Sequence, residues 1–337
     1  MQQSGGVGLD PHTKVTSRGA GKLPALIKTL VAIFFTQVSQ SADRLVGRAY
    51  SSLAHEITIT STRMTNQHAT ELSLLPTLGG TGLTRKNVIV LTHGWTGSSI
   101  FSALFREAGY WLGGETMVKP DYDTFENTEL VALNNRLLHE LAPTLNHEHQ
   151  FSDEGVLQIA TRSAGLDLSP YRKFIADCNW RQPWLWKDPR LTWTVRAWEP
   201  ALDMDQTAFL VLTRDPTQAW ISANLRRHVQ SYGFTRSYNG GITQSNLRFL
   251  QERGLNYLEL SFEDLLLKPE DTLAKLNGFF NLGLSLAQLN AVCRLPLRRK
   301  SRNWKDFTVA SLIYMKNFGE RDGRNRLANR TVSAAAK

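Results

Sequence analysis

The stretch Asn87-Val-Ile-Val-Leu-Thr-His-Gly-Trp-Thr-Gly-Ser-Ser99 decides the fold. Its first half is a short, continuous, β-branched run, which is typical of a strand buried on both faces of a parallel sheet. Its second half contains two glycines, which permit a tight turn. An apolar face with helical spacing follows, formed by Ile100, Leu104 and Ala108. We therefore expect a buried strand, a glycine loop and a helix over 99–112.

Strand and helix patterns alternate through the rest of the chain. Further strands are predicted at 184–187, 208–213 and 256–260. Helices are predicted at 127–141, 192–202, 216–230, 243–253 and 269–280. This alternation predicts an α/β fold in which a parallel, P-loop-like sheet carries helices on both faces. Ligands of such sheets bind beyond the carboxyl ends of the strands.

The composition indicates one globular domain. The chain has 337 residues and is 42% hydrophobic, enough for one sizeable core. We expect a disordered or amphipathic segment at 1–50, a single domain at 51–330 and a disordered tail at 331–337. The apolar run at 23–38 is short for a membrane span and Lys28 interrupts it, which favours a buried or amphipathic helix. It also resembles the apolar part of a signal peptide.

The formal net charge of +9 favours an anionic ligand. Part of the excess lies in the basic cluster 298–302, which a solvated tail explains as well as a nucleic-acid site does. The chain has no zinc-finger spacing and no aromatic-basic RNA motif, so no nucleic-acid partner is expected. Its two cysteines, Cys178 and Cys293, exclude a disulfide scaffold and a Cys-rich zinc site.

The glycine loop at 92–99 has the features of an anion site. Backbone N–H groups at the start of the following helix point outward, and the helix dipole favours negative charge there. The sequence lacks Gly-Lys-Ser/Thr, so it is not a Walker A loop, and a P-loop kinase or NTPase is the weaker alternative. A plain connector would have the same pattern.

A second junction between strand and helix carries Arg214-Asp-Pro216, with Ser222 eight residues after Arg214. Arginine offers a two-pronged donor to a phosphate, proline suits a first helical turn, and Ser222 lies two turns along the same helix. The alternative is that Asp215 caps the helix while Arg214 makes a surface ion pair.

These motifs resemble those of sulfotransferases that use 3'-phosphoadenosine-5'-phosphosulfate (PAPS). The 5'-phosphosulfate loop of that family reads roughly Gly-x-x-Arg-Ser-Gly-Thr-Ser, which places Gly97 on the central glycine and Ser98-Ser99 on the Thr-Ser pair. The chain departs from the pattern at Trp95, where the family has a basic residue, and at Thr92, where it has glycine.

Three further stretches resemble the same family. Trp186-Lys-Asp-Pro-Arg-Leu191 matches a Lys-Asp-Pro-Arg motif of bacterial members, and Tyr257 to Leu266 resembles the segment that contains Tyr-Glu-Asp-Leu. The stretch Arg299-Lys-Ser-Arg-Asn-Trp-Lys-Asp-Phe is similar to the Arg-Lys-Gly…Trp-Lys lid of cytosolic members, without its glycines. The resemblance covers about 88–284 and implies the sulfotransferase fold.

The resemblance also implies a site for PAPS and its product PAP, the desulfated nucleotide. The loop would hold the 5'-phosphosulfate, and Arg214 with Ser222 would hold the 3'-phosphate. Lys187 is the expected catalytic cation, with Lys119 as the alternative, and no metal is required. The implied cofactor-binding residues are Trp95, Thr96, Gly97, Ser98, Ser99, Arg214 and Ser222.

Sulfuryl transfer needs a base for the acceptor hydroxyl or amine, and two carboxylates compete for that role. Gly113-Gly-Glu-Thr116 resembles the segment that carries the base of tyrosylprotein sulfotransferases, which suggests Glu115. Asp188 lies where other members place a group that faces the acceptor. Glu115 could instead be a solvated loop acid, and Asp188 a partner of Arg190. His93 is a third candidate.

Two other classes of protein remain open. In an α/β-hydrolase, the loop His93-Gly-Trp-Thr-Gly-Ser98 would form the oxyanion hole, Ser163 would be the nucleophile and His228 the base. However, Thr161 stands where the nucleophile motif requires glycine. The other alternative is a non-catalytic nucleotide-binding protein, for which Trp95 in the usually basic position is the best argument.

The acceptor is left open by the sequence. A carbohydrate, a lipid or another small molecule would suit, and Trp180, Trp184 and Trp186 suggest an aromatic platform for a sugar. A cytoplasmic location is favoured, with membrane association and oligomeric state left open. The whole interpretation requires that Gly97 and Arg214 face the same cleft.

Overall fold

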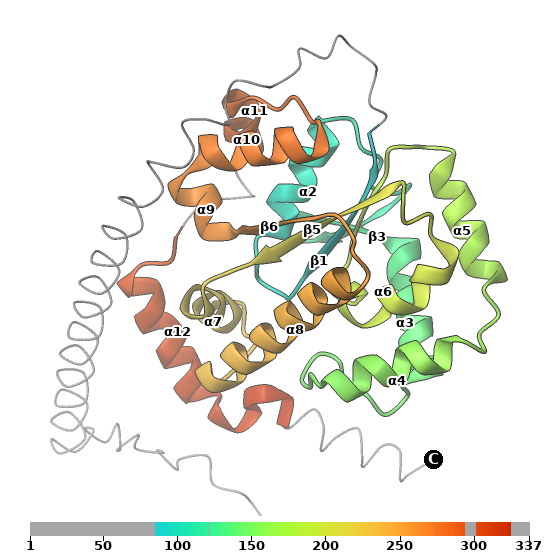
Figure 1. Ribbon diagram of the computed structural model, residues 1–337. Helices are drawn as coiled ribbons and strands as arrows, with labels where there is room; N and C mark the ends of the chain where they lie inside the picture. The colour runs from blue at the N-terminus through green and yellow to red at the C-terminus, as the bar shows by residue number, and fades with distance from the viewer. Residues whose placement is uncertain (1–84, 121, 294–300, 325–337) are drawn as a thin grey trace, which may run out of the picture. The chain divides into compact units, whose positions relative to one another are not determined.

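A four-stranded parallel sheet forms the centre of the protein (Figure 1). The computed structural model describes residues 85–120, 122–293 and 301–324. The strands are β1 (Asn87–Thr92), β4 (Leu185–Lys187), β5 (Thr207–Thr213) and β6 (Tyr257–Ser261), in the order β4-β1-β5-β6. All four strands lie within one residue of the predicted bounds. The predicted domain limits at 50 and 330 and the apolar run at 23–38 lie outside the described residues.

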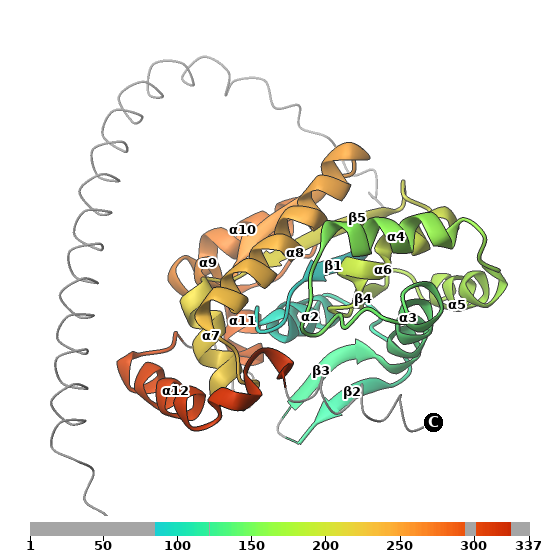
Figure 2. The same ribbon diagram turned by 90° about the horizontal axis from the view of Figure 1, so that it is seen from below.

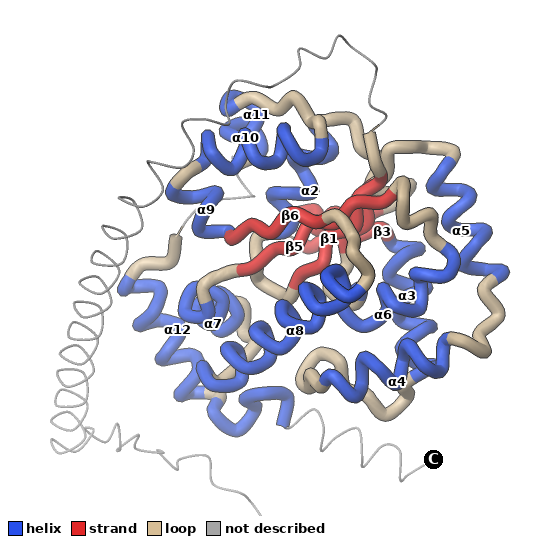
Figure 3. Tube along the Cα trace, in the orientation of Figure 1, coloured by secondary structure: helices blue, strands red, loops and turns tan. Residues whose placement is uncertain are grey.

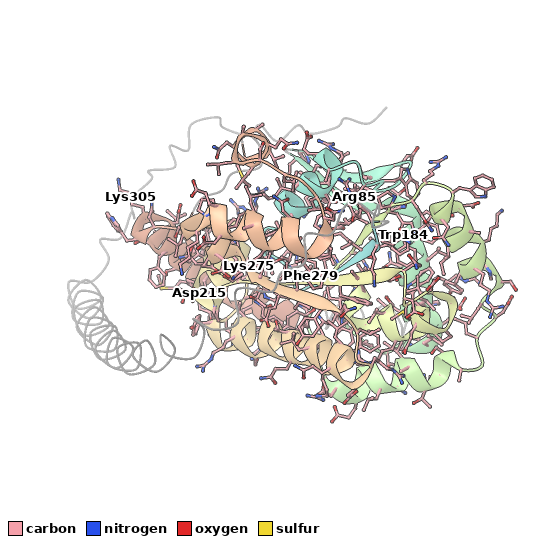
Figure 4. All side chains as sticks on the ribbon, turned by 45° about the horizontal axis from the view of Figure 1, so that its top comes forward. Arg85, Trp184, Asp215, Lys275, Phe279 and Lys305 are labelled. Atoms are coloured by element: carbon pink, nitrogen blue, oxygen red, sulfur yellow. The ribbon has the colours of Figure 1, made fainter. Side chains whose placement is uncertain are left out.

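Helices cover both faces of this sheet (Figure 3). The helices that precede β5 are α2 (Ser98–Glu107), α3 (Thr128–Leu141), α4 (Asp153–Ser163), α5 (Ser169–Asn179), α6 (Leu191–Trp198) and the 3-10 turn η1 (Glu199–Ala201). Those that follow β5 are α7 (Pro216–Leu225), α8 (Tyr232–Glu252), α9 (Phe262–Leu267), α10 (Pro269–Phe280), α11 (Leu286–Val292), α12 (Trp304–Lys316) and the 3-10 turn η2 (Phe318–Gly323). Figure 4 shows their side chains filling the space on the two sides of the sheet.

Alternation along the strands divides the core into two clusters. Ile89 and Phe209 pack with α3, α4, α5, α6 and α8 on one face. Val90 and Leu210 pack with α2, α10 and α11 on the other face. Successive strand residues point to opposite faces, so a strand covered on both sides must be apolar throughout, as β1 and β5 are. The predicted α/β fold with a parallel sheet between helices is therefore confirmed.

Several local elements differ from the sequence prediction, and three of them contribute residues to the cavity described below. The chain forms an antiparallel hairpin of β2 (Thr116–Lys119) and β3 (Tyr122–Asn127), whose polar sequence gives no strand signal (Figure 2). Helix α7 ends at Leu225, because Arg227 adopts a φ of 61°. Helix α8 begins 11 residues earlier than predicted and runs through Gly241, where a Cβ would lie 2.5 Å from the Phe151 ring. Packing therefore explains this mid-helix glycine.

Helix α12 packs against α7 at the side of the molecule. Trp220 of α7 contacts Phe307 and Tyr314 of α12, with ring centroids 5.5 and 6.2 Å apart. Lys305 of α12 lies at the outer edge (Figure 4). Among the described residues, no helix combines the length and the apolar character that a membrane span requires.

Candidate active site

A cavity of about 710 Å³ lies at the carboxyl ends of the four parallel strands. Each strand contributes through the segment that follows it: Trp95 follows β1, Pro189 follows β4, Arg214 follows β5 and Phe262 follows β6. Parallel strands bring these segments to one edge of the sheet, where ligands of α/β folds bind. The volume is in the range of small-molecule and cofactor sites.

The loop after β1 adopts a strained conformation that brings its backbone to the cavity. Trp95 has a φ of 71° and Gly97 a φ of 73°, both in the left-handed region. A Cβ on Gly97 would lie 2.4 Å from the ring of Phe262. Gly97 is therefore required both by its backbone angle and by the close approach of Phe262.

The start of α2 is open to the cavity. The N-cap position is Gly97, and no side chain accepts a hydrogen bond from the first turn. By contrast, the N-cap side chains of α3, α7 and α8 accept such bonds. Ser98 and Ser99 line the cavity, so their backbone N–H groups and the helix dipole favour an anion there.

Thr96, which was predicted to bind the cofactor, does not belong to the cavity lining. It is fully buried, and its Oγ1 lies 2.5 Å from Oγ1 of Thr92. The same hydroxyl donates to the carbonyl of His93 at 3.3 Å. Thr92 and Thr96 therefore stabilise the loop by hydrogen bonds to each other and to its backbone. Thr92 is the residue that stands at the first glycine of the sulfotransferase loop motif.

Arg214 joins the second predicted motif to the first. Its Nη1 donates to the carbonyl oxygen of Trp95 at 2.6 Å, and its guanidinium lies 4.6 Å from the centroid of Phe262. Oε1 of Glu263 lies 3.8 Å from Nε of Arg214. Burial lowers the pKa of Arg214 to about 10, and nearby Arg302 adds to this effect while Glu263 opposes it. Arg214 is therefore still a cation at neutral pH.

One donor of Arg214 is left for a ligand. Its side chain is 7% exposed, and Nε makes no hydrogen bond among the described residues. Oε1 of Glu263, 3.8 Å from Nε, pairs with the charge of Arg214 but is too far away for a hydrogen bond, so an oxygen atom of a ligand can still accept from Nε. Asp215 caps α7 by accepting from the N–H of Gln218, as one alternative predicted, and Arg214 does form an ion pair, with Glu263, that is largely buried rather than on the surface.

A third chain segment reaches the same place. Arg302 lines the cavity and donates from Nε to Oγ of Ser222 at 3.1 Å. The side chain of Gln218 fixes it, since its amide accepts from the N–H of Arg302 and donates to the carbonyl oxygen of Arg302. The sequence placed Arg302 in a basic cluster of uncertain role, and the lid-like stretch 299–307 was its one signal. Residues 298–300 of that cluster lie outside the described residues.

Lys187 reaches the cavity from the end of β4 and pairs with an acid that the sequence did not indicate. Its Nζ lies 2.6 Å from Oε1 of Glu126 and 3.1 Å from the carbonyl oxygen of Thr124. Glu126 belongs to β3, and both residues line the cavity. The hairpin is polar and has no alternating apolar pattern, so the sequence did not predict that Glu126 lies in a strand or near Lys187.

Neither carboxylate predicted as the base faces the cavity. Glu115 is exposed on the loop before β2 and does not belong to the lining. Asp188 is fully buried, where its carboxylate accepts from Asn134 Nδ2 at 2.8 Å and from Arg190 Nη1 at 2.9 Å. Burial raises the pKa of Asp188, opposed mainly by Arg190. The alternative in which Asp188 is a partner of Arg190 describes its geometry.

His93 lines the cavity as a buried, neutral imidazole. Burial lowers its pKa to about 4; the nearby charge of Arg214 also lowers it, while a hydrogen bond between Nδ1 and the carbonyl of Gly94 raises it. It is therefore uncharged at neutral pH.

The cavity is strongly basic. Of the residues that the structure describes, two carboxylates line it, Glu126 and Glu148. The cations of the lining are Lys119, Lys187, Arg190, Arg214, Arg226 and Arg302. This excess of positive charge suits a ligand with several negative charges. Within the described ranges, no group of three or more His, Cys, Asp or Glu side chains could hold a metal ion.

The structure does not support two alternatives that the sequence had left open. Trp184 and Trp186 are buried in the core with ring centroids 4.5 Å apart, and Trp180 is 89% exposed outside the cavity, so they form no platform. Ser163 is the last residue of α4 and donates to the carbonyl of Ala160. A hydrolase nucleophile needs a turn between strand and helix, so the hydrolase alternative is not supported.

Comparisons with solved structures give similarities to sulfotransferases and to retinol dehydratase. No family model and no curated protein matches the chain. The sulfotransferase domain of the curacin biosynthetic pathway is 17% identical, with a TM-score of 0.37, over 66% of this chain and 82% of that chain. The sulfotransferase domain of the Synechococcus PCC 7002 olefin synthase is 14% identical, with a TM-score of 0.36, over 67% and 93%. Retinol dehydratase in a complex with retinol and PAP is 14% identical, with a TM-score of 0.33, over 71% and 83%.

Proposed function

We propose that this protein transfers a sulfuryl group from PAPS to a hydroxyl or amine of an acceptor. One observation carries the proposal: the Gly97 loop and the Arg214 segment, each predicted to hold one end of the donor, are hydrogen-bonded to each other and line one cavity. A molecule with two phosphate groups can therefore contact both.

The donor nucleotide would contact two groups of residues in the lining of the basic cavity. Nε of Arg214 and the pair of Arg302 and Ser222 would hold the 3'-phosphate, since guanidinium groups bind phosphate by charge-assisted hydrogen bonds. The open N–H groups of Ser98 and Ser99 would hold the 5'-phosphosulfate.

Lys187 would supply the positive charge that Trp95 cannot. When bound, PAPS supplies the sulfuryl group: one S–O bond forms to the acceptor as the S–O bond to the 5'-phosphate breaks. Negative charge then grows on that phosphate, where Lys187 and the amides of α2 stabilise it. No part of this reaction requires a metal.

Glu126 is the carboxylate that we propose as the base. It lines the cavity beside Lys187, whereas Glu115 and Asp188 do not. Its carboxylate would take the proton from the acceptor hydroxyl while the new S–O bond forms. Lys187, 2.6 Å away, would fix its orientation.

Binding and turnover test different parts of this proposal. Titration calorimetry of the full chain should show that PAP binds at least tenfold more tightly than 5'-AMP, because only PAP has the 3'-phosphate that Arg214 and Arg302 would contact. Equal affinities for the two nucleotides would overturn the donor assignment. Release of PAP from PAPS in the presence of an acceptor extract would separate an enzyme from a protein that only binds the nucleotide.

A further inference from the structure

The cavity lining includes residues on both sides of β1. In the sheet order β4-β1-β5-β6, Arg214 and Ser222 follow β5 on one side of β1, while Lys187 ends β4 on the other side. Arg190 lies three residues beyond Lys187 and also lines the cavity. The space on the β4 side is therefore where an acceptor would approach the sulfuryl group.

Besides Nε of Arg214, two nitrogen donors of the cavity lining make no hydrogen bond among the described residues. Asn239 of α8 is 8% exposed, and its Nδ2 makes no hydrogen bond among the described residues. Nε of Arg190 is likewise buried without a partner among them, although Nη1 of the same side chain is bonded to Asp188. Buried donors in folded proteins are almost always paired, so these two indicate a ligand that supplies oxygen atoms.

The packing of α8 on α6 identifies the face of α8 that carries Asn239 and lines the cavity. Asn246 of α8 donates from Nδ2 to Oγ1 of Thr192 on α6 at 3.2 Å. Asn239 precedes Asn246 by seven residues, which is about two helical turns, and so shares its face. Ile242 lies between them and lines the cavity. This face of α8 therefore runs from the α6 contact to the wall of the cavity.

We infer that Arg190 and Asn239 form an acceptor subsite for a hydroxyl-rich molecule, a saccharide, an inference that rests on the proposed sulfuryl transfer. The oxygen atoms of sugar hydroxyls can accept from both buried donors, and the carboxylate of Glu148 in the same lining can accept from a sugar hydroxyl. An apolar alcohol would leave both donors unpaired, which costs binding free energy.

Ligand-observed NMR on the PAP-saturated full chain tests this subsite. The probes are the methyl glycosides of glucose, galactose and mannose, with cyclohexanol as an apolar alcohol of the same ring size. We expect at least one glycoside to bind more tightly than cyclohexanol. Asn239→Leu should weaken that glycoside about tenfold and leave the PAP dissociation constant within twofold.

A second variant and a control keep the result interpretable. Arg190→Lys retains a cation beside Asp188 but has no Nε donor, so glycoside binding should fall several-fold in it too. Trp180→Ala, at an exposed residue outside the cavity, should bind as the unmodified protein does.

Three results would overturn the inference: cyclohexanol binding as tightly as every glycoside, glycoside binding unchanged in both variants, or loss of PAP binding in Asn239→Leu, which would assign Asn239 to the donor. Failure of the unmodified protein to bind PAP would instead overturn the proposed function.

Discussion

The guanidinium of Arg214 donates from Nη1 to the carbonyl oxygen of Trp95 at 2.6 Å, across 119 residues of sequence. Trp95 and Gly97 both have a positive φ, and in this loop conformation the carbonyl oxygen of Trp95 accepts from Arg214. The bond fixes the segment after β5 against the loop after β1. Gly97 and Arg214 thus face the same cavity, which the sequence interpretation required.

Removal of the Arg214 side chain should abolish recognition of the 3'-phosphate. We expect Arg214→Ala to weaken PAP binding by 10- to 100-fold, about 1.5–3 kcal/mol for a charge-assisted hydrogen bond, and to remove the rise in melting temperature that PAP produces. Differential scanning fluorimetry with and without PAP measures both effects. Arg248→Ala, which removes a half-exposed arginine paired with Asp153, is the matched control. An unchanged PAP-induced shift in Arg214→Ala would contradict the assignment.

A methyl group at Gly97 should disrupt the loop after β1. Gly97→Ala places a Cβ 2.4 Å from the Phe262 ring at a φ of 73°, so we expect a loss of about 1–3 kcal/mol in the free energy of unfolding together with loss of PAP binding. Urea denaturation and calorimetry measure the two effects. Gly278→Ala in α10 has open space around the new Cβ and should be neutral or slightly stabilising. Equal stability of the two variants would show that the loop tolerates a side chain.

Glu126→Gln should slow sulfuryl transfer without weakening PAP. The amide keeps the shape of the side chain but cannot take a proton, so we expect the turnover number to fall by 10²–10⁴-fold. Radiolabelled transfer from PAPS and calorimetry with PAP give the two readouts. Glu115→Gln, at an exposed residue outside the cavity, should keep normal activity. Loss of activity in Glu115→Gln but not in Glu126→Gln would restore the assignment made from sequence.

His93 should make the fold less stable in mild acid. Its pKa in the folded protein is about 4, mainly because of burial, whereas an unfolded histidine titrates near 6.5. Between these values the unfolded chain binds a proton that the folded chain does not, so stability falls as the pH falls below about 6.5 and is constant above it.

Urea unfolding at several pH values measures this dependence. Between pH 7 and pH 5, His93 should contribute a loss of about 2 kcal/mol in the free energy of unfolding. In His93→Gln, the free energy of unfolding should fall by about 2 kcal/mol less over the same pH range. A variant with the same pH slope as the unmodified protein would show that His93 does not titrate in this way.

The strands were predictable because a strand that is buried on both faces has a continuous run of apolar residues. Neither β1 nor β5 alternates between polar and apolar residues, so each is recognisable without a partner. The hairpin of β2 and β3 has no such apolar run, since most of its side chains are exposed or half-buried. Its position depends on contacts with α2 and β4, which sequence patterns do not reveal.

The carboxylate that we propose as the base, Glu126, could not be predicted from the sequence either. The Lys-Asp pair at 187–188 offered both a cation and a carboxylate in one motif. Successive residues of an extended chain point to opposite sides, so Lys187 enters the cavity while Asp188 turns toward Asn134 in the core. Glu126, which is distant in sequence, then meets Lys187.

The sequence by itself determined the α/β alternation and the two segments that follow β1 and β5, because strand burial, glycine turns and helix starts are local properties of the chain. Only the tertiary structure decided which charged groups share the cavity: Glu126 and Arg302 enter it, and Glu115 and Asp188 do not. The physical reason is that a side chain reaches a site through the packing of its whole element, and that packing depends on residues far away in the sequence.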